Sequence, residues 1–230
     1  VHPQPDEWFP SLVFQCKPNL PWADDHFAER VSGIPSNPGE QWNKWPFYRE
    51  GSAWDEEFRK GGGQFTHSYQ ERMWPTHVDL GHWCEGGIHR PMQGIRYAYG
   101  DLMDVVNLLR REPLTRQAWL PIWFPEDTGA CHGGRVPCTL GYHFLQRNRR
   151  LDMYYIIRSC DVIRYLRDDV YMACRLLLWV LNQLTDMENT PDQNSSGWRD
   201  VVPGMFHFHA FSLHMFEGDR YVDVQKLAQR

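Results

Sequence analysis

Two short segments of the sequence contain residue types that can do covalent and phosphate chemistry. In the first, RVPCT at residues 135–139, Cys138 stands just before a strand-like run. A cysteine attacks carbon only as its thiolate, which forms more readily beside positive charge. Arg135 supplies such charge, and Arg158 would do so if it folds alongside. By itself the segment is ambiguous, because a cysteine simply packed under a strand is the commoner case.

The second segment, RSCD at residues 158–161, combines a guanidinium, a hydroxyl and a carboxylate within four positions. Arginine can donate two parallel hydrogen bonds to a phosphate and serine can add a third, so the pair suits a phosphate monoester. An arginine that pairs with a neighbouring aspartate for structural reasons is at least as common. Neither segment alone therefore indicates a function.

Periodic patterns predict the elements that must position these segments. Apolar residues recur at helical spacing over residues 101–111, and Pro113 closes that helix. A second, largely buried helix is predicted over residues 170–184, with Asp168 and Asp169 standing where an N-cap would. Four segments have the composition of strands: residues 118–124, 139–145, 151–157 and 205–216.

The remaining organisation is that of one domain. Residues 1–64 are rich in Pro, Gly and Trp and predict loops and short helices. The alternation of strands and helices with buried faces predicts a mixed α/β or α+β fold. A chain of 230 residues is long enough for one substantial core. We therefore expect a single domain over residues 1–230, with residues 1–64 as its irregular N-terminal part.

Composition excludes several classes of protein. No apolar run reaches the roughly 20 residues of a membrane helix, so we expect no membrane partner. A net charge of −5 argues against a broad nucleic-acid surface, although a few arginines could still hold one phosphate. The six cysteines have no signal peptide ahead of them. They predict reduced thiols in a cytoplasm, which would be that of the host if the protein is viral.

Taken in order along the chain, the motifs are more specific than any one of them. Pro137-Cys138 followed about twenty residues later by Arg-Ser-x-Asp resembles the thymidylate synthase family. The resemblance runs from about Gly94 to Tyr221. Its other members are Tyr99-Gly100, the PLTR turn at 113–116, the strand with Trp123, and His207-Phe208-His209.

The resemblance implies a thymidylate-synthase-like fold that dimerises through a face of its sheet. In that family a cysteine thiolate adds to carbon 6 of a pyrimidine nucleoside monophosphate. Carbon 5 then becomes nucleophilic and attacks the methylene of 5,10-methylenetetrahydrofolate. Cys138 would be this nucleophile, with folate as co-substrate and no metal.

Substrate-binding residues follow from the same matches. Arg158 and Ser159 match the pair that holds the nucleotide phosphate. Arg116 matches the first of two arginines lent by the other subunit of the homodimer, whereas Gln117 stands at the second position. His207 matches the histidine near the sugar hydroxyl. Two further histidines join this group: His209, which replaces the tyrosine that accompanies it, and His143.

On the folate side the match is less complete. Asp161 matches the aspartate that meets the pterin, and Met73-Trp74 resembles an Ile-Trp pair that flanks the folate. Tyr165 occupies the place of a family glycine beside the folate, so the packing of the co-substrate must differ there.

Three further functional residues of the family are a catalytic tyrosine, a glutamate and an N-terminal arginine. Tyr99 is expected to act in catalysis. The glutamate that relays protons to the folate has no clear counterpart, and Glu71 and Glu40 are the nearest candidates. The N-terminal arginine that also holds phosphate is unassigned, with Lys17 and Arg30 as candidates.

Asp169 is the position that predicts the base. Thymidylate synthases carry asparagine there, in a Phe-Asn-Ile context, whereas LRDDV at residues 166–170 resembles bacteriophage deoxycytidylate hydroxymethylases. Those enzymes also share the dipeptide found at Cys138-Thr139. A carboxylate can accept from the cytosine amino group while sharing a proton with ring nitrogen 3, but it sets oxygen against oxygen when it faces uracil. The alternative is that Asp169 only caps a helix and Asp168 reads the base, or that neither meets the ligand.

We therefore predict hydroxymethylation of dCMP, a function suited to a virus that marks its own DNA. Within the same family, a CMP enzyme of nucleoside biosynthesis or an enzyme acting on dUMP stays open. A zinc deaminase is disfavoured, because Cys138 is followed by Thr139-Leu140-Gly141 and not by the second metal cysteine. A metal site at His207 and His209, or a catalytically dead binding protein, are the remaining alternatives.

Overall fold

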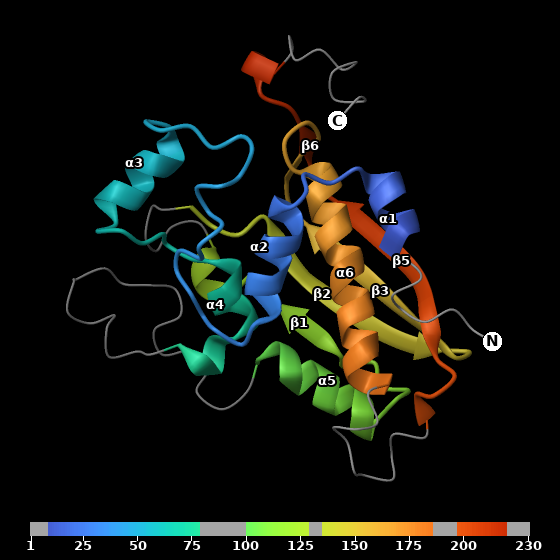
Figure 1. Cartoon of the computed structure of the whole chain (residues 1–230). Coiled ribbons are helices and arrows are strands. Elements are labelled where there is room, and N and C mark those ends of the chain that lie inside the picture. The colour runs from blue at the N-terminus through green and yellow to red at the C-terminus, as the bar shows by residue number, and fades with distance from the viewer. Residues whose placement is uncertain (1–8, 79–99, 129–134, 186–196, 220–230) are drawn as a thin grey trace.

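The computed structural model of the chain describes residues 9–78, 100–128, 135–185 and 197–219. Helices pack against one face of a four-stranded sheet (Figure 1). The sheet has the order β1-β2-β3-β5, in which β1, β2 and β3 pair antiparallel and β3 pairs parallel with β5. These strands span Trp119–Pro121, Thr139–Arg147, Arg150–Ile157 and Val202–Ala210. The prediction of a mixed sheet packed with helices is confirmed.

The pairing of β2 with β3 sets the position of both chemical segments. A two-residue turn joins the strands, and its residues Asn148 and Arg149 have φ angles of 51° and 58°. Positive φ at both central residues matches the right-handed twist of paired strands. Because Thr139 lies opposite Ile157, the residues just before β2 and just after β3 are neighbours in space.

The helices come from all parts of the chain. Their bounds are α1 Phe9–Cys16, α2 Trp22–Val31, α3 Ala53–Lys60, α4 Tyr69–Met73, α5 Leu102–Arg111 and α6 Leu166–Thr185. Short 3-10 turns lie at Pro75–His77, Pro125–Asp127 and Glu217–Asp219. A second, two-stranded parallel sheet pairs β4, Cys160–Asp161, with β6, Leu213–His214.

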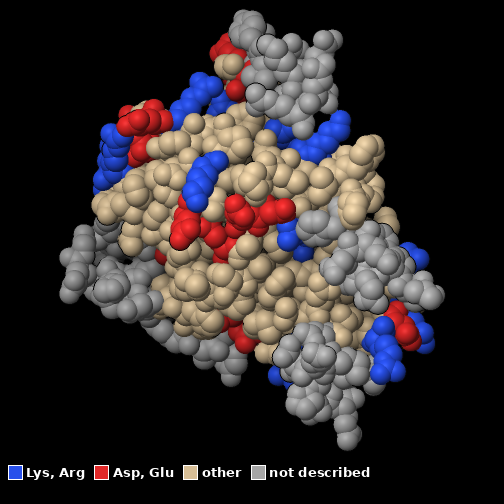
Figure 2. All heavy atoms as spheres, viewed as in Figure 1, with Lys and Arg blue, Asp and Glu red and all other residues tan. Residues whose placement is uncertain are grey.

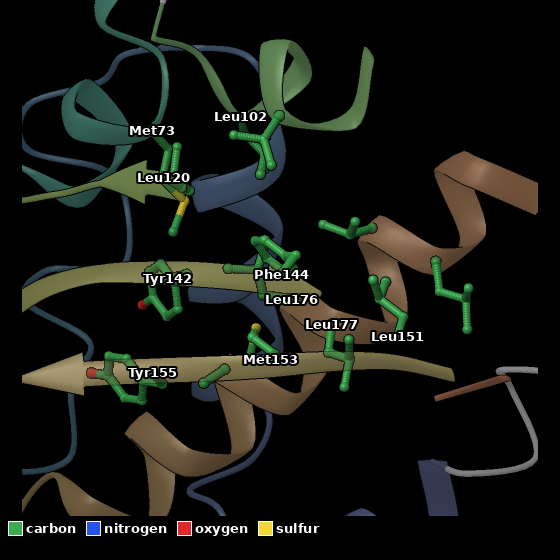
Figure 3. Packing of buried hydrophobic residues seen from close by; sticks show 14 of the residues in the cluster. Met73, Leu102, Leu120, Tyr142, Phe144, Leu151, Met153, Tyr155, Leu176 and Leu177 are labelled. Atoms are coloured by element: carbon green, nitrogen blue, oxygen red, sulfur yellow. The ribbon is translucent and has the colours of Figure 1, made fainter. Parts of the chain in front are cut away.

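The main core lies between the sheet and α6. Figure 3 shows Phe144 and Met153 of the sheet beside Leu176 and Leu177 of α6, all of them buried. Tyr142 and Tyr155 extend this layer toward the Cys138 end of the strands, and their rings stack with centroids 4.8 Å apart. Such burial removes apolar surface from water at about 25 cal/mol per Å², which holds α6 and the sheet together.

Two polar contacts attach the N-terminal helices and α4 to this core. Asp24 in α2 accepts a hydrogen bond from the hydroxyl of Tyr171 in α6 at 2.7 Å and is also bonded by Arg175. Arg72 in α4 forms a bidentate ion pair with Asp127 at 2.6 and 2.8 Å, and both side chains are fully buried. Burial of two charges is tolerated when they satisfy each other in this way.

Several sequence-based expectations need adjustment. The helix predicted over 101–111 is α5, and residues 9–64 contain loops and short helices as expected. The N-cap prediction for Asp168 and Asp169 is wrong, because α6 begins at Leu166 and both aspartates lie in its first turn. Acidic side chains are favourable there because they face the positive end of the helix dipole. The strand predicted over 205–216 is divided into β5 and β6, with Phe211 and Ser212 between them.

The face of the molecule in Figure 2 shows no single dominant charge. On the face in Figure 2, acidic side chains gather over α2, whose first turn holds Asp24 and Asp25, and basic ones stand apart around it. Among the described helices, none combines the length and apolar character needed to cross a lipid bilayer.

Candidate active site

Cys138 lies at the entrance to β2, and Arg158 folds alongside it. The backbone N–H of Arg158 donates to the carbonyl of Cys138 at 2.8 Å. Its side chain donates from Nε to the Pro137 carbonyl at 2.9 Å and from Nη2 to the Val136 carbonyl at 3.2 Å. Nη2 is then 4.0 Å from the Cys138 sulfur. The register of β2 and β3 therefore brings a guanidinium next to the predicted nucleophile.

The thiol of Cys138 is under opposing influences. Partial burial raises its pKa, and the nearby carboxyl of Asp169 raises it further. Arg158 and, more weakly, Arg135 lower the pKa. Removing water from around a thiolate is unfavourable, whereas a positive neighbour favours it. The net pKa of the thiol is raised, and the two arginines are the groups that oppose this rise and favour the thiolate.

Asp169 stands in the first turn of α6, close enough to Cys138 to raise the pKa of its thiol. Burial raises the pKa of its carboxyl to about 7, Arg30 opposes the shift, and Asp168 adds to it. Within the described residues its one hydrogen-bond partner is the thiol of Cys160, with Sγ 3.9 Å from Oδ2. At neutral pH this carboxyl can therefore hold a proton and still offer its oxygens to a ligand.

Asp168 has a different role. Its Oδ1 accepts from the backbone N–H of Asn19 at 2.7 Å, and its Oδ2 accepts from the Asn19 side-chain amide at 2.6 Å. Only 1% of the residue is exposed. Both oxygens are thus engaged in attaching the N-terminal segment to α6. Of the two adjacent aspartates, Asp169 is the one open to a base.

Tyr69 in α4 is a site residue that the sequence analysis did not single out. Its hydroxyl accepts from Thr139, the residue after Cys138, at 3.4 Å from the backbone N–H and 3.2 Å from Oγ1. Burial raises the pKa of this phenol, and the nearby Cys138 and Asp169 raise it further. Tyr69 belongs to no catalytic motif by its neighbours, so only the tertiary contact reveals it. Tyr99, the tyrosine predicted to be catalytic, lies outside the described residues.

The residues predicted to bind the phosphate are only partly brought together in the structure. Ser159 follows Arg158 and lies next to His214 of β6, with Oγ and Nδ1 3.3 Å apart. Arg116 is exposed just before β1, and its carbonyl lies 3.1 Å from Nε2 of His143. Arg116 is therefore oriented toward solvent, as an arginine lent to another subunit would need to be.

The three predicted substrate histidines lie on the sheet face turned away from α6. The ring of His207 stacks on that of Tyr154 with centroids 4.2 Å apart, and Tyr154 is 6.3 Å from His143. His209 is exposed on the same strand and meets Phe211 edge-on. The structure thus does not gather these histidines around Cys138, and their contact with substrate stays a prediction.

The predicted folate residues fall into two groups. Asp161 is buried, and its Oδ1 accepts from the backbone N–H groups of Ile163 and Arg164 at 2.8 and 3.0 Å. Its Oδ2 is buried without a hydrogen-bond partner in the described part of the chain. An unsatisfied buried carboxylate oxygen is costly, and a donor group of the pterin would satisfy it.

Met73, Trp74 and Glu71 have structural roles in the fold. Met73 and Trp74 are core residues with 2% and 4% of their surface exposed, and the Trp74 indole donates to the carbonyl of Arg30 at 2.8 Å. Glu71 accepts from the backbone N–H of Ser68 at 2.9 Å in a capping box. Their predicted roles with folate stay predictions.

A row of stacked aromatic rings, which we call the aromatic wall, lies beside the site and includes Tyr165. The Tyr165 ring stacks on Trp45 with centroids 4.5 Å apart, and Trp45 stacks on Trp54 at 5.5 Å. The Arg135 guanidinium covers the Trp54 ring at 4.1 Å. Since Arg135 and Cys138 both affect the pKa of Tyr165, which burial raises, this wall borders the nucleophile.

No three metal-ligating side chains converge within the described ranges of the chain. The four cysteines described, Cys16, Cys138, Cys160 and Cys174, are free thiols.

Comparison with known proteins places this geometry. Residues 36–193, more than half of the chain, match the family model described as Thymidylate synthase. The chain belongs to the thymidylate synthase family. Members of this family are transferases that move one carbon unit from methylenetetrahydrofolate to a pyrimidine nucleotide.

The family assignment agrees with a solved structure. The chain is similar to thymidylate synthase from T4 phage, with a TM-score of 0.52 and 18% sequence identity. The alignment covers 92% of this chain and 64% of that chain, so the present chain spans less than two thirds of the length of the phage enzyme. At this identity the likeness shows the fold alone. No curated protein matches the chain.

Proposed function

We propose that the protein transfers a hydroxymethyl group from 5,10-methylenetetrahydrofolate to carbon 5 of dCMP. Cys138 is the covalent nucleophile and Asp169 recognises the cytosine. The observation that carries the proposal is the pair of adjacent aspartates in α6. Both oxygens of Asp168 are bonded to Asn19, whereas Asp169, which raises the pKa of the Cys138 thiol, has only the Cys160 thiol as a side-chain partner among the described residues.

The base preference follows from the proton on Asp169. Cytosine presents a bare nitrogen 3 and an amino donor on carbon 4. A protonated carboxyl donates to the first through its hydroxyl and accepts from the second through its other oxygen. Burial favours this protonated form, since it raises the pKa of Asp169 to about 7. After the proton has passed to nitrogen 3, the carboxylate accepts from both N–H groups.

The same carboxyl assists the covalent step. The thiolate of Cys138 forms a bond to carbon 6. The electron pair of the carbon 5–carbon 6 double bond then forms a double bond between carbon 4 and carbon 5. The electron pair displaced from carbon 4 goes to nitrogen 3, which takes the proton of Asp169. The product is an enamine whose carbon 5 attacks the methylene of the folate. General acid assistance of this kind is worth about 10²–10⁴-fold in rate.

The folate provides the one-carbon unit at its methylene. Asp161 is suited to hold the pterin, because its Oδ2 has no hydrogen-bond partner within the described chain and is approached only by Nε of Arg164 at 3.9 Å. After carbon 5 has bonded to the methylene, carbon 5 loses its proton and tetrahydrofolate leaves, which gives an exocyclic methylene. Addition of water to this methylene, with departure of the Cys138 thiolate from carbon 6, gives hydroxymethyl, whereas addition of hydride from the folate gives methyl. Hydration is proposed because Asp169 and the Cys138-Thr139 dipeptide resemble those of the deoxycytidylate hydroxymethylases.

An activity assay with each nucleotide in turn, followed by mass detection of the product, tests the proposal. The purified protein is incubated with methylenetetrahydrofolate and one of dCMP, CMP or dUMP. We expect a product from dCMP that is heavier by one CH₂O unit. Cys138→Ala is expected to abolish it, and Cys174→Ala serves as the matched control because Cys174 is a free thiol on α6. Thymidylate formed from dUMP alone, or retained activity in Cys138→Ala, would overturn the proposal, and conversion of CMP would reassign the sugar.

A further inference from the structure

Arg30 in α2 is a buried cation without a counterion. Only 7% of the residue is exposed. Its Nη2 lies 3.1 Å from Nε2 of His26, and its guanidinium covers the ring of Tyr69 at 4.3 Å. Its Nε is buried with no acceptor, and among the described residues no carboxylate lies within ion-pairing distance of it. A buried charge left in this way is costly unless a negative partner forms during function.

A chain of three residues holds the guanidinium in place. Glu29 accepts from Nδ1 of His26 at 3.2 Å, which leaves the Nε2 lone pair of His26 to accept from Arg30. Burial, together with the Arg30 charge, lowers the pKa of His26 to about 4, so the ring is neutral at pH 7. Glu29 is itself fixed by the Gln41 backbone N–H at 3.0 Å and the Gln70 amide at 3.2 Å. The arginine is therefore oriented before any ligand binds.

The guanidinium of Arg30 lies over the ring of Tyr69, whose hydroxyl bonds to Thr139, the residue after Cys138. Helix α2 packs against α4 and α6, which carry Tyr69 and Asp169. Arg30 is the cation that lowers the pKa of Asp169 and so opposes the effect of burial. The titratable groups that share this interior with Asp169 are Arg30 on α2, Tyr69 on α4, Asp168 on α6, Tyr165 just before α6, Cys138 and Tyr142 at β2, Tyr155 on β3 and Cys160 on β4.

We infer that Arg30 is a positioning residue that stabilises the carboxylate of Asp169 after its proton has passed to ring nitrogen 3. The inference rests on the proposed function of Asp169. With a pKa of about 7, Asp169 is protonated in a substantial fraction of molecules at neutral pH, and Arg30 has no carboxylate partner among the described residues. When thiolate attack at carbon 6 sends an electron pair to nitrogen 3, the proton leaves Asp169, and the negative charge appears opposite a cation already in place. A preorganised charge of this kind stabilises the product of the proton transfer without reorganisation.

The alternative is a purely structural role, in which Arg30 only packs on Tyr69 and joins α2 to α4. Both roles predict some loss of activity when Arg30 is replaced. They differ in what happens to the acidity of Asp169, because only an electrostatic partner changes it.

The first test measures that acidity without substrate. Protein labelled with ¹³C at the aspartate carboxyls is titrated by NMR, and Asp169→Asn identifies the resonance. In Arg30→Gln we expect the pKa of Asp169 to rise by about one unit, a tenfold gain in proton affinity, whereas Arg30→Lys should leave it nearly unchanged. Arg175→Met is the matched control, since Arg175 also covers an aromatic ring, that of Phe27, at 4.6 Å. A pKa that does not move in Arg30→Gln would overturn the inference.

The second test is the pH dependence of turnover with dCMP. Because the reaction needs Asp169 protonated, kcat/KM falls as the pH rises through its pKa. In Arg30→Gln we expect this alkaline fall to move to higher pH, with kcat lowered about 10- to 100-fold and KM for dCMP little changed. If the alkaline fall of kcat/KM stays at the same pH, or if Arg175→Met loses as much kcat as Arg30→Gln, the role of Arg30 is structural.

Two further arrangements keep the tests decisive. If Arg30→Gln does not fold, His26→Phe removes the bond that orients Arg30 and retains a ring beside Trp22, which stacks on His26 at 5.0 Å. We then expect a smaller rise in the pKa of Asp169. An unchanged pKa would count against the inference. If wild-type protein does not convert dCMP but the NMR shift is present, the proposed function fails while the electrostatic effect of Arg30 on Asp169 stands.

Discussion

At the scale of residues, the site depends on which of two adjacent carboxyls is available. Asp168 and Asp169 are chemically identical and neighbours in sequence. Both oxygens of Asp168 are occupied by Asn19, whereas the Asp169 carboxyl, which raises the pKa of Cys138, bonds only to the Cys160 thiol within the described residues. This difference, and not the presence of an Asp-Asp pair, supports the assignment of the base-reading residue.

Replacing Asp169 is expected to change the base. An amide at this position donates to the uracil carbonyl and accepts from its ring N–H, so Asp169→Asn should lose at least about 10²-fold in kcat/KM for dCMP and gain turnover of dUMP. Steady-state kinetics with both nucleotides measure the change. Asp168→Asn is the control, which should keep the preference for dCMP while losing about 1–3 kcal/mol of stability with its bonds to Asn19. A base preference that follows Asp168 would reverse the assignment.

The raised pKa of Asp169 should also be visible in stability. The carboxyl has a pKa of about 7 in the fold and about 3.8 when unfolded, so the unfolded state loses its proton first as pH rises. Stability should therefore fall between about pH 4 and pH 7 and stay level above. We expect Asp169→Asn to be as stable as wild type near pH 4 and more stable at pH 8, by at most about 4 kcal/mol. Water that still reaches the carboxylate in the partly open site makes this difference smaller. Urea unfolding at both pH values provides the comparison, and a constant difference would contradict it.

Arg158 should control the reactivity of Cys138. It lies 4.0 Å from the sulfur and lowers the pKa of the thiol, so Arg158→Ala should shift the pH midpoint of alkylation upward. Iodoacetamide labelling followed by peptide mass spectrometry reports Cys138 directly. Cys16 is an internal control, because only burial raises the pKa of its thiol, and its labelling should not respond. An equal response of both thiols would point to general loosening.

At the scale of elements, strand register brings the chemical segments together. β2 begins directly after Cys138, β3 ends directly before Arg158, and the pairing of Thr139 with Ile157 aligns those ends. A shift of register between Thr139 and Gly141 marks a local irregularity at this point. The position of the nucleophile therefore depends on close packing between β1 and the start of β2.

Gly141 should be sensitive to even one added methyl group. A Cβ at this position would lie 2.6 Å from the Leu120 carbonyl oxygen and 2.5 Å from the Trp119 ring. Backbone in β1 cannot move without loss of pairing, so Gly141→Ala should cost about 1–3 kcal/mol of stability. Gly218→Ala is the control, since nothing lies within 4 Å of the corresponding Cβ. Thermal unfolding of both variants tests this, and equal midpoints would show that β1 gives way at little cost.

At the scale of the whole molecule, we propose that the sheet face turned away from α6 is where two copies meet. This face carries Tyr154 and His207, and exposed apolar side chains lie along it and beyond it, including Met205 and Phe211. Arg116 stands exposed at the edge strand of the same sheet. Contact across this face would allow Arg116 of one copy to reach the phosphate site near Arg158 of the other.

Mixing two inactive variants tests the shared site. In a dimer of Arg116→Ala with Cys138→Ala, one of the two sites combines an intact Cys138 with an intact Arg116. Random exchange makes half of the dimers mixed, so about a quarter of wild-type activity should return. Analytical ultracentrifugation confirms the dimer, and mixtures that stay inactive although subunits exchange would show that Arg116 is not lent.

How much the sequence could predict depended on how local each signal is. The helix over 101–111, the β2 and β3 strands, and the Cys138 and Arg158 segments follow from periodicity and from short motifs, because their determinants lie within a few neighbouring residues. The start of α6 was misplaced, because an aspartate caps a helix or occupies its first turn with equal local preference.

What only the tertiary structure decided concerns residues distant in sequence. Asn19 is 149 positions from Asp168, so no local pattern could show that it occupies that carboxyl. Tyr69 and Arg30 likewise gain their significance from long-range contacts, since Tyr69 bonds to Thr139 and Arg30 packs on the Tyr69 ring. Sequence determined by itself that a thiol, a guanidinium and paired acids were present in the order typical of the family. The fold decided which acid faces the thiol, because burial and long-range hydrogen bonds, not residue type, set which groups remain free to react.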